Sequence, residues 1–348
     1  MIGLGKMGRL HMMTCSRMGG VDVVAAADQS KRALSKAKSA GVTKLYTDYH
    51  ELLDHSANID AVIVSLPNFL HFESVKLALE SGLDVFVEKP MANTVEQCRE
   101  IVRTANRNGA RCMPGHCMRF IDAIEKMKKT RDEGRIGDLE VVTLEELLNG
   151  PFAHGLLPTP VPEWWFNPEK SGGGVLLDLG YHLIDLFRFF AEGDCRVEFC
   201  SLDHKLHLPL EDGAILVLRS SDPSAKGIVN VGWFQKSVFP DFNFRVILHG
   251  DAGYVSSEDL RPRNVYLHAI KEGGKNLLSR LAGKKIRTLS YSYYYTQYPK
   301  ELQHFFNSIK DDSNPPVSAV DGLRTLELIE EAYMIDSSKK GDSNGRHS

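Results

Sequence analysis

No stretch of this 348-residue sequence is apolar over the ~18 residues that a membrane-spanning helix needs. No signal peptide is visible and no internal repeat is found, and the formal net charge of only −3 gives no overall attraction to nucleic acid. These absences exclude integral membrane proteins and repeat architectures. They predict a cytoplasmic protein with neither a membrane nor a nucleic-acid partner.

Cysteine is also scarce, and no pair of cysteines has the CxxC spacing of a zinc site or a redox motif. Six cysteines scattered through a long chain fit reduced thiols better than a disulfide framework, so we expect no metal site. What is present is ordinary for a globular protein, with 43% hydrophobic and 25% charged residues. The length suggests two domains.

The first motif is a glycine-rich turn of the GxGxxG type, followed by a predicted helix over residues 9–18. Such a turn brings the main chain close to a pyrophosphate, and the helix N-terminus favours the negative charge of the phosphates. The turn consists of Gly3, Leu4, Gly5, Lys6, Met7 and Gly8. Because the strand before it has only two residues, we expect the native protein to begin upstream or Met1 to be an internal start.

Asp28 ends a predicted strand over residues 21–27 and follows Gly8 by 20 residues. An acid at this place can accept both ribose hydroxyls of NAD, and it repels the 2′-phosphate of NADP. The structural alternative is a helix N-cap. Lys31 and Arg32 lie nearby, so NADP is not excluded.

Strand and helix patterns alternate through the first third of the chain, which predicts a doubly wound parallel sheet in a dinucleotide-binding domain over residues 1–116. Ligands of such sheets bind at the carboxyl ends of the strands. Residues 65–71 and 88–90 follow predicted strands in this way. The main chain of Lys89 is extended because Pro90 follows it, so we expect the ammonium beside the cofactor site. A solvated lysine at a strand end is the alternative.

A strongly apolar helix is predicted over residues 175–190, behind three consecutive glycines. Asp178, His182 and Asp185 share one face of this otherwise buried helix, at i, i+4 and i+7. An unpaired buried polar group costs about 1–3 kcal/mol, so these side chains must meet one another, another side chain or a ligand. A satisfied structural Asp–His pair is the alternative to a site. We assign Asp185 to structure.

Residues 117–336 are predicted to form an α+β domain with a large, mostly antiparallel open sheet, and residues 337–348 a polar tail. One strand is predicted over residues 265–269. If the open face of the sheet is apolar, it predicts a homodimer or homotetramer. Basic residues and tyrosines over residues 271–298 could form a solvated loop, meet the diphosphate of a nucleotide sugar, or stack on single-stranded nucleic acid.

Six segments together resemble the glucose–fructose oxidoreductase/inositol dehydrogenase (Gfo/Idh/MocA) family over nearly the whole chain. They are GLGKMG at 3–8, Asp28, SLPNFLH at 65–71, VEKP at 87–90, GHCMRF at 115–120 and SGGGVLLDLGYHLID at 171–185. EKP combined with a later GGGxxxDxGxH is specific, whereas either motif alone is not. The resemblance implies an NAD-binding Rossmann domain and a second domain that binds a sugar-like small molecule.

The resemblance also indicates site residues and a cis Lys89–Pro90 bond. Besides the glycine turn, the expected cofactor contacts are Asp28, Ser65, Leu66, Pro67, Asn68, His71, Glu88 and Lys89. The expected substrate contacts are Lys89, His116, Arg119, Trp164, Trp165, Asp178 and His182. The two tryptophans could instead belong to a lid or the core. The family often has Phe-Asn where this chain has His116-Cys117, which puts that asparagine's contact in doubt.

The expected reaction is hydride transfer between NAD(P) and a secondary hydroxyl of a sugar, cyclitol or nucleotide sugar. His182 would take the hydroxyl proton, because a histidine titrates near working pH. Asp178 would orient it, and Lys89 would hold the hydroxyl oxygen. The resemblance implies the same three residues, although family members differ over whether lysine or histidine is the base. An NAD-dependent glycosidase that uses transient oxidation and a non-catalytic nucleotide-binding regulator stay open as alternatives.

Overall fold

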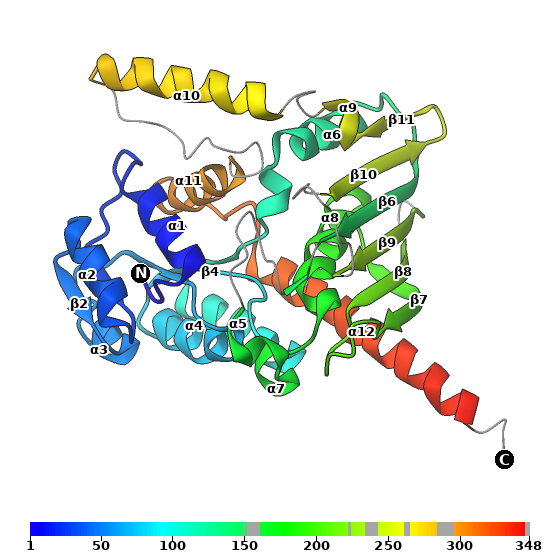
Figure 1. The fold of residues 1–348 in the computed structure, drawn as a ribbon, viewed down its shortest axis with the longest axis horizontal. Helices are drawn as coiled ribbons and strands as arrows, with labels where there is room; N and C mark the ends of the chain where they lie inside the picture. Colours follow the sequence, from blue (N-terminus) through cyan, green and yellow to red (C-terminus); the bar gives the residue numbers. More distant parts are fainter. Residues whose placement is uncertain are drawn as a thin grey trace. The chain divides into compact units, whose positions relative to one another are not determined.

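The computed structural model describes residues 1–148, 150–151, 161–221, 224–233, 243–260, 265–283 and 296–344. The chain divides into two compact units (Figure 1). The first comprises Met1–Ile121 and Pro262–Leu323, and the second comprises Asp122–Arg261 and Arg324–Ser348. A late segment of the chain therefore returns to the N-terminal unit, which the sequence pattern does not indicate.

The first unit is built on a parallel sheet whose strands alternate with helices. Its strands are β1 (Ala25–Ala27), β2 (Lys44–Tyr46), β3 (Ala61–Val64), β4 (Asp84–Val87) and β5 (Cys112–Pro114). β1 pairs with β2, and β4 pairs with both β3 and β5, in each case in parallel. Ile2 joins the two groups through parallel bridges to Ala27 and Val64. The resulting order, β2–β1–Ile2–β3–β4–β5, confirms the predicted doubly wound sheet.

Helices lie on both sides of this sheet. The helices of this unit are α1 (Lys6–Cys15), α2 (Lys31–Ser39), α3 (Tyr49–Asp54), η1 (Asn68–Leu70), α4 (His71–Glu80), α5 (Val95–Asn108), η2 (Cys117–Phe120), α10 (Val265–Leu281) and α11 (Gln297–Lys310). Figure 1 shows α1 and α11 on one side of the strands and α4 and α5 on the other. The ends of α5 follow from its sequence, because the Thr94 hydroxyl accepts the N–H of Gln97 and Gly109 ends the helix at φ +62°.

The second unit contains a six-stranded open sheet in the order β11–β10–β6–β9–β8–β7. The strands are β6 (Leu139–Leu147), β7 (Cys195–Asp203), β8 (Gly213–Ser220), β9 (Lys226–Gly232), β10 (Asn243–Gly250) and β11 (Gly253–Ser256). Every neighbouring pair is antiparallel except β6 with β9, which confirms the mostly antiparallel prediction. Along β8, Leu216 and Leu218 are buried, whereas Ile215 points to the opposite, exposed face.

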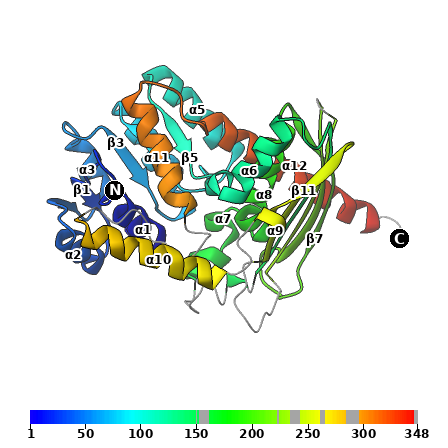
Figure 2. The same cartoon turned by 90° about the horizontal axis from the view of Figure 1, so that it is seen from above.

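The helices of the second unit are α6 (Asp122–Asp132), η4 (Glu163–Phe166), α7 (Pro168–Ser171), η5 (Leu176–Gly180), α8 (Tyr181–Ala191), α9 (Ser257–Leu260) and α12 (Ala319–Asn344), which begins in the first unit. Of these, η5 and α8 pack against the central strands of the sheet. Figure 2 shows α8 along the sheet. A Cβ on Gly227 of β9 would lie 2.7 Å from the Phe187 ring, so this glycine allows α8 to pack closely.

Two segments differ from the sequence-based prediction. Residues 265–269, predicted as a strand, begin α10, in which Leu267, Ile270, Leu277 and Leu281 recur with helical spacing. α12 continues to Asn344, into the predicted polar tail. Residues 152–160 of the predicted proline-rich connection and 284–295 of the basic and tyrosine-rich segment lie outside the described residues. Within the described ranges, none of the helices combines the length and apolar character needed to cross a bilayer.

Candidate active site

The glycine turn before α1 has the geometry of a phosphate-binding loop. Gly3 adopts φ +87°, and a Cβ there would lie 2.6 Å from the carbonyl oxygen of Ser65. A Cβ on Gly8 would overlap the carbonyl oxygen of Gly3, so both positions require glycine. A Cβ on Gly5 would meet nothing within 4 Å, and no side chain caps the helix there. The first N–H groups of α1 are therefore available to a phosphate.

Asp28 anchors this turn through its carboxylate. The N–H groups of Leu4 and Ser30 donate to different carboxylate oxygens, each at 2.7 Å. Ser30 caps α2, because its hydroxyl accepts the N–H of Ala33 at 3.3 Å. The N-cap alternative for Asp28 is therefore wrong. Its carboxylate lies beside the glycine turn after β1, where Rossmann domains bind ribose hydroxyls.

A cavity of about 280 Å³ shares Ser30 with this site. It is lined by Arg9, Ser30, Arg32, Ala33 and Lys36. Three cationic side chains thus surround a space close to the Asp28 carboxylate, with which Ser30 is bonded. Such a cavity can hold an anionic group such as a phosphate.

His71 ties together the loops that follow β3 and β4. Its buried ring has Nδ1 2.7 Å from the carbonyl oxygen of Pro90 and Nε2 2.8 Å from that of Leu66. Burial lowers the pKa of His71, so the neutral ring donates to one of these two carbonyls. The Lys89–Pro90 bond that His71 adjoins is cis, which confirms the expectation. The His71 ring thus packs between two loops of the expected cofactor site and donates to one of them.

The remaining expected cofactor residues gather at the same carboxyl edge. Ser65, Leu66, Pro67, Asn68, Glu88 and Lys89 are all partly accessible there. By contrast, His116 and Arg119 are buried. Arg119 donates from Nη2 to Oδ1 of Asp321 at 3.0 Å, so its guanidinium is engaged in an ion pair that joins η2 to the first turn of α12. A substrate that contacts Arg119 would have to share its guanidinium with Asp321.

The apolar helix of the second unit consists of two elements. A π-helical turn, η5, covers Leu176–Gly180, and α8 continues from Tyr181. Asp178 in η5 and His182 in α8 stay partly accessible, whereas Asp185 is only 2% exposed. Single π-helical turns frequently occur at functional sites. The predicted polar face is therefore divided, with Asp178 and His182 reachable and Asp185 inside.

The start of η5 is held by Glu211, which the sequence analysis missed. Oε1 of this buried carboxyl accepts the N–H groups of Gly174 at 2.8 Å and Leu176 at 3.1 Å. The hydroxyl of Tyr333 donates to the same oxygen at 2.7 Å. Burial raises the pKa of Glu211, although these donors oppose the rise. The carbonyl of Gly174 in turn accepts the N–H of Asp178 at 2.9 Å, so the contact reaches a candidate catalytic residue.

The three glycines contain the signal that could have found this contact. A Cβ on Gly174 would overlap the carbonyl oxygen of Glu211, and a Cβ on Gly173 would overlap the hydroxyl of Tyr333. Adjacent glycines predict a close approach of another segment. They do not identify that segment, because the partners are distant in the sequence. Glu211 follows Gly174 by 37 positions, and Tyr333 follows Glu211 by 122 positions.

Trp164 and Trp165 lie in η4 and pack on one another. The ring centroids of Trp164 and Trp165 are 6.0 Å apart, and those of Trp165 and the buried Trp233 are 6.4 Å apart. Both η4 tryptophans stay partly accessible. They therefore join an aromatic cluster but retain surface that a sugar ring could meet.

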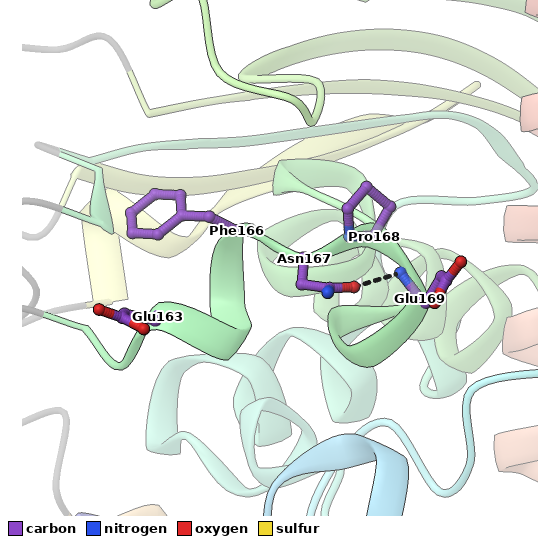
Figure 3. A pocket seen from close by; sticks show the side chains of 5 residues that line it. All are labelled: Glu163, Phe166, Asn167, Pro168 and Glu169. Carbon is purple, nitrogen blue, oxygen red and sulfur yellow. Dashed lines mark hydrogen bonds between the residues drawn. The ribbon is translucent and has the colours of Figure 1, made fainter.

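A second cavity, of about 520 Å³, lies next to these tryptophans in the chain. It is lined by Glu163, Phe166, Asn167, Pro168 and Glu169 (Figure 3). Oδ1 of Asn167 accepts the N–H of Glu169 at 3.0 Å, so this side chain caps α7. The cavity adds two carboxylates to the surface before the glycines, and its lining does not include Asp178 or His182.

Comparison with known families agrees with both units. Residues 1–116 match the oxidoreductase family with an NAD-binding Rossmann fold, and residues 124–256 match the GFO/IDH/MocA C-terminal domain. A glycine-turn Rossmann unit joined to an open-sheet unit defines an NAD-binding enzyme of the oxidoreductase class. The chain belongs to the GFO/IDH/MocA family.

Individual relatives cover most of the chain. It is 23% identical to inositol 2-dehydrogenase of Rhizobium meliloti over 345 residues, or 98% of this chain and 97% of that protein. It is 31% identical to 1,5-anhydro-D-fructose reductase of Ensifer adhaerens over 219 residues, or 62% and 63%. The crystal structure of scyllo-inositol dehydrogenase from Lactobacillus casei with NAD(H) and scyllo-inositol superposes with a TM-score of 0.78 at 19% identity, covering 97% and 96%. That last likeness concerns the fold.

Proposed function

We propose that the chain transfers a hydride between NAD and a secondary hydroxyl of a sugar, cyclitol or nucleotide sugar. The observation that carries this proposal is the pattern of accessibility along η5 and α8. In the first two turns of this buried helix, Asp178 and His182 are the polar side chains that stay partly accessible. A carboxylate and an imidazole one turn apart are suited to proton transfer.

The first unit fits a dinucleotide at the edge where Lys89 stands. Gly3 and Gly8 let the main chain approach a pyrophosphate, and Asp28 offers carboxylate oxygens to ribose hydroxyls. Bound NAD would supply the hydride acceptor. The names of the relatives, which include inositol and sugar enzymes, support a polyol or sugar as the donor.

Each of the three candidate catalytic residues has a separate task. His182, as the neutral imidazole, takes the proton of the reacting hydroxyl while the hydride leaves its carbon. Asp178 orients the ring and favours the imidazolium that forms. Lys89 donates from its ammonium to the hydroxyl oxygen and stabilises negative charge that develops there. Trp164 and Trp165 offer aromatic faces to the apolar side of a sugar ring.

NADP is a second cofactor for the same site. The cavity lined by Arg9, Arg32 and Lys36 supports it, because these cations suit a 2′-phosphate. The Asp28 carboxylate opposes it by charge repulsion. We therefore expect NAD to bind more tightly than NADP, by a margin that equilibrium titration with NADH and NADPH measures directly.

The experiment that tests the function is an NADH-absorbance screen over polyols, sugars, sugar phosphates and nucleotide sugars. His182→Asn should lower kcat by about 10²–10⁴-fold, the usual contribution of a general base. The NADH dissociation constant should stay within a few fold. His204→Asn, which changes an exposed histidine of the same unit, is the matched control and should keep wild-type turnover. Full activity in His182→Asn would refute the assignment.

The same screen separates the alternatives. Release of a sugar from a glycoside without net NADH would indicate a glycosidase with transient oxidation. Cofactor binding without turnover of any compound would indicate a regulator. Net NADH formation that needs His182 supports the dehydrogenase.

A further inference from the structure

His11 is a buried polar residue of the first unit that has no part in the function proposed above. It lies on the inner face of α1, among Gly8, Met12 and Cys15, and is 0% exposed. The edges of two aromatic rings confine the imidazole. The ring centroids of Phe86 and Tyr298 lie 5.3 Å and 6.1 Å from that of His11. These rings limit the orientations that are open to the imidazole.

The imidazole points at Glu88, the residue before Lys89. Nε2 of His11 lies 2.5 Å from Oε1 of Glu88, whose side chain is 15% exposed. The other carboxylate oxygen of Glu88 faces Gly115, where an added Cβ would lie 3.4 Å away. The N–H of Glu88 donates to the carbonyl of Val64 at 2.9 Å. Both the main chain and the carboxylate of Glu88 are thus held.

The protonation states follow from these contacts. Burial opposes the ionisation of Glu88, but the hydrogen bond from His11 and the charge of Lys89 keep its pKa below the usual value. An ionised carboxylate only accepts, so Nε2 of His11 donates. Nδ1 is buried and has no hydrogen-bond partner among the described residues. A proton on Nδ1 would be a buried donor without an acceptor among the described residues, so the contacts favour a ring that carries its proton on Nε2.

We propose that His11 is a positioning residue, which fixes the Glu88 carboxylate and, through it, the turn that presents the Lys89 ammonium. The inference rests on the proposed role of Lys89. His11 holds the turn from α1, and the buried ring of His71 in α4 lies beside the Pro90 carbonyl of the same turn. The fixed carboxylate also keeps a negative charge next to the Lys89 ammonium.

Other groups around Glu88 leave this assignment intact. His71 faces it from α4, Cys117 from η2, and Lys89 from the same turn. Glu301 of α11 faces Cys117 in turn. Burial raises the pKa of Cys117 far above neutrality, so this thiol stays uncharged at working pH. Among the influences that lower the pKa of Glu88, the hydrogen bond from His11 is the largest, ahead of the charges of Lys89 and His71.

The test compares two substitutions of His11. His11→Phe keeps a ring between Phe86 and Tyr298 but removes the donor, whereas His11→Gln keeps a donor. We expect His11→Phe to lower kcat about 10- to 100-fold, since small misplacements of a reacting group have effects of this size. KM and the NADH dissociation constant should change less than threefold. The acid limb of the kcat profile should move to higher pH, because Glu88 protonates more readily without its donor. His11→Gln should restore most of the loss.

His55→Phe is the matched control, since His55 is exposed on the same unit and lies 5.9 Å from Tyr46 in a stacked pair. Wild-type kcat and pH profile in a folded His11→Phe protein would overturn the proposal. ¹⁵N NMR of the imidazole in the wild-type protein gives a readout that needs neither folding of a variant nor turnover. A ring that carries a proton on Nε2, neutral or as the imidazolium, supports the proposal, and an Nδ1–H tautomer, whose Nε2 cannot donate to Glu88, overturns it. Wild-type protein that binds NADH but oxidises nothing would refute the proposed function, while the NMR result would still decide the state of His11.

Discussion

Removal of one hydroxyl at Tyr333 tests how the second unit holds its candidate catalytic turn. In the wild-type protein this hydroxyl donates at 2.7 Å to a carboxyl oxygen of Glu211 that also accepts the N–H groups of Gly174 and Leu176. The pKa of Tyr333 is raised far above its usual value, mainly by burial, so the hydroxyl stays protonated at every working pH. Tyr333→Phe removes this donor and leaves the two N–H donors in place.

The expected magnitude follows from the charge and burial of Glu211. A hydrogen bond to a charged group contributes about 1.5–3 kcal/mol. Glu211 is only 4% exposed but keeps two other donors, so we expect the lower end, about 1.5–2 kcal/mol. In a unit of this size the loss corresponds to a fall in Tm of about 3–8 °C. The kcat should also fall, because the Gly174 carbonyl that accepts the Asp178 N–H loses part of its support.

The ionisation of Glu211 determines how the difference in Tm between wild type and Tyr333→Phe should change with pH. Burial raises the pKa of Glu211 in the folded protein, so its contribution to stability is full at low pH and is lost as the pH rises through that value. The Tyr333 hydroxyl matters most when Glu211 is ionised. The difference in Tm between wild type and Tyr333→Phe should therefore be larger at pH 8 than at pH 5.

Differential scanning calorimetry at these two pH values measures the effect. Tyr254→Phe is the matched control, because Tyr254 belongs to the same unit and is 66% exposed. It should change stability by less than about 0.5 kcal/mol. The reasoning fails if Tyr333→Phe and Tyr254→Phe have the same Tm at pH 8. It also fails if the difference in Tm between wild type and Tyr333→Phe grows as the pH falls.

Two further predictions concern the cofactor and assembly. Asp28→Ala removes the carboxylate that binds the Leu4 and Ser30 N–H groups, so the NADH dissociation constant should rise at least about tenfold. The NADPH constant should rise less, since charge repulsion is removed at the same time. Equal changes in the two fluorescence titrations would contradict the assigned ribose contact. We also propose that the open sheet face forms a homodimer or homotetramer, because Ile215 and Ile228 lie exposed on adjacent strands at 48% and 43%. Ile228→Asp should reduce the sedimentation coefficient to that of a monomer, and a monomeric wild-type protein would remove the basis for this prediction.

The sequence by itself determined the parts of this protein that depend on neighbouring residues. The glycine turn, Asp28 after its strand, and the alternation of strands and helices are local patterns, and their physical requirements are local too. Gly3 and Gly8 leave no room for a Cβ, as the turn predicts. The mostly antiparallel sheet of the second unit followed from short strands and short turns.

Local patterns gave a wrong prediction where a short run of residues fits both a strand and a helix. They also failed where a helix departs from regular α-helical geometry. Residues 265–269 read as a strand because a short apolar run fits both strand and helix, and only its continuation in α10 decides. Asp178, His182 and Asp185 were placed on one face by assuming a regular α-helix. The π-helical turn over Leu176–Gly180 departs from that geometry, whereas the burial of Asp185 agrees with its assignment to structure.

Only the tertiary structure decided which distant groups hold the site. His11 and Glu88 lie 77 positions apart, and Tyr333 and Glu211 lie 122 positions apart. Glu88 belongs to a recognisable motif, but His11, Glu211 and Tyr333 are ordinary in their own segments. A buried histidine in an apolar helix face and a run of glycines indicate that a partner exists, because buried polar groups require one and glycines permit a close approach. The identity of that partner depends on packing between segments, which no local pattern encodes.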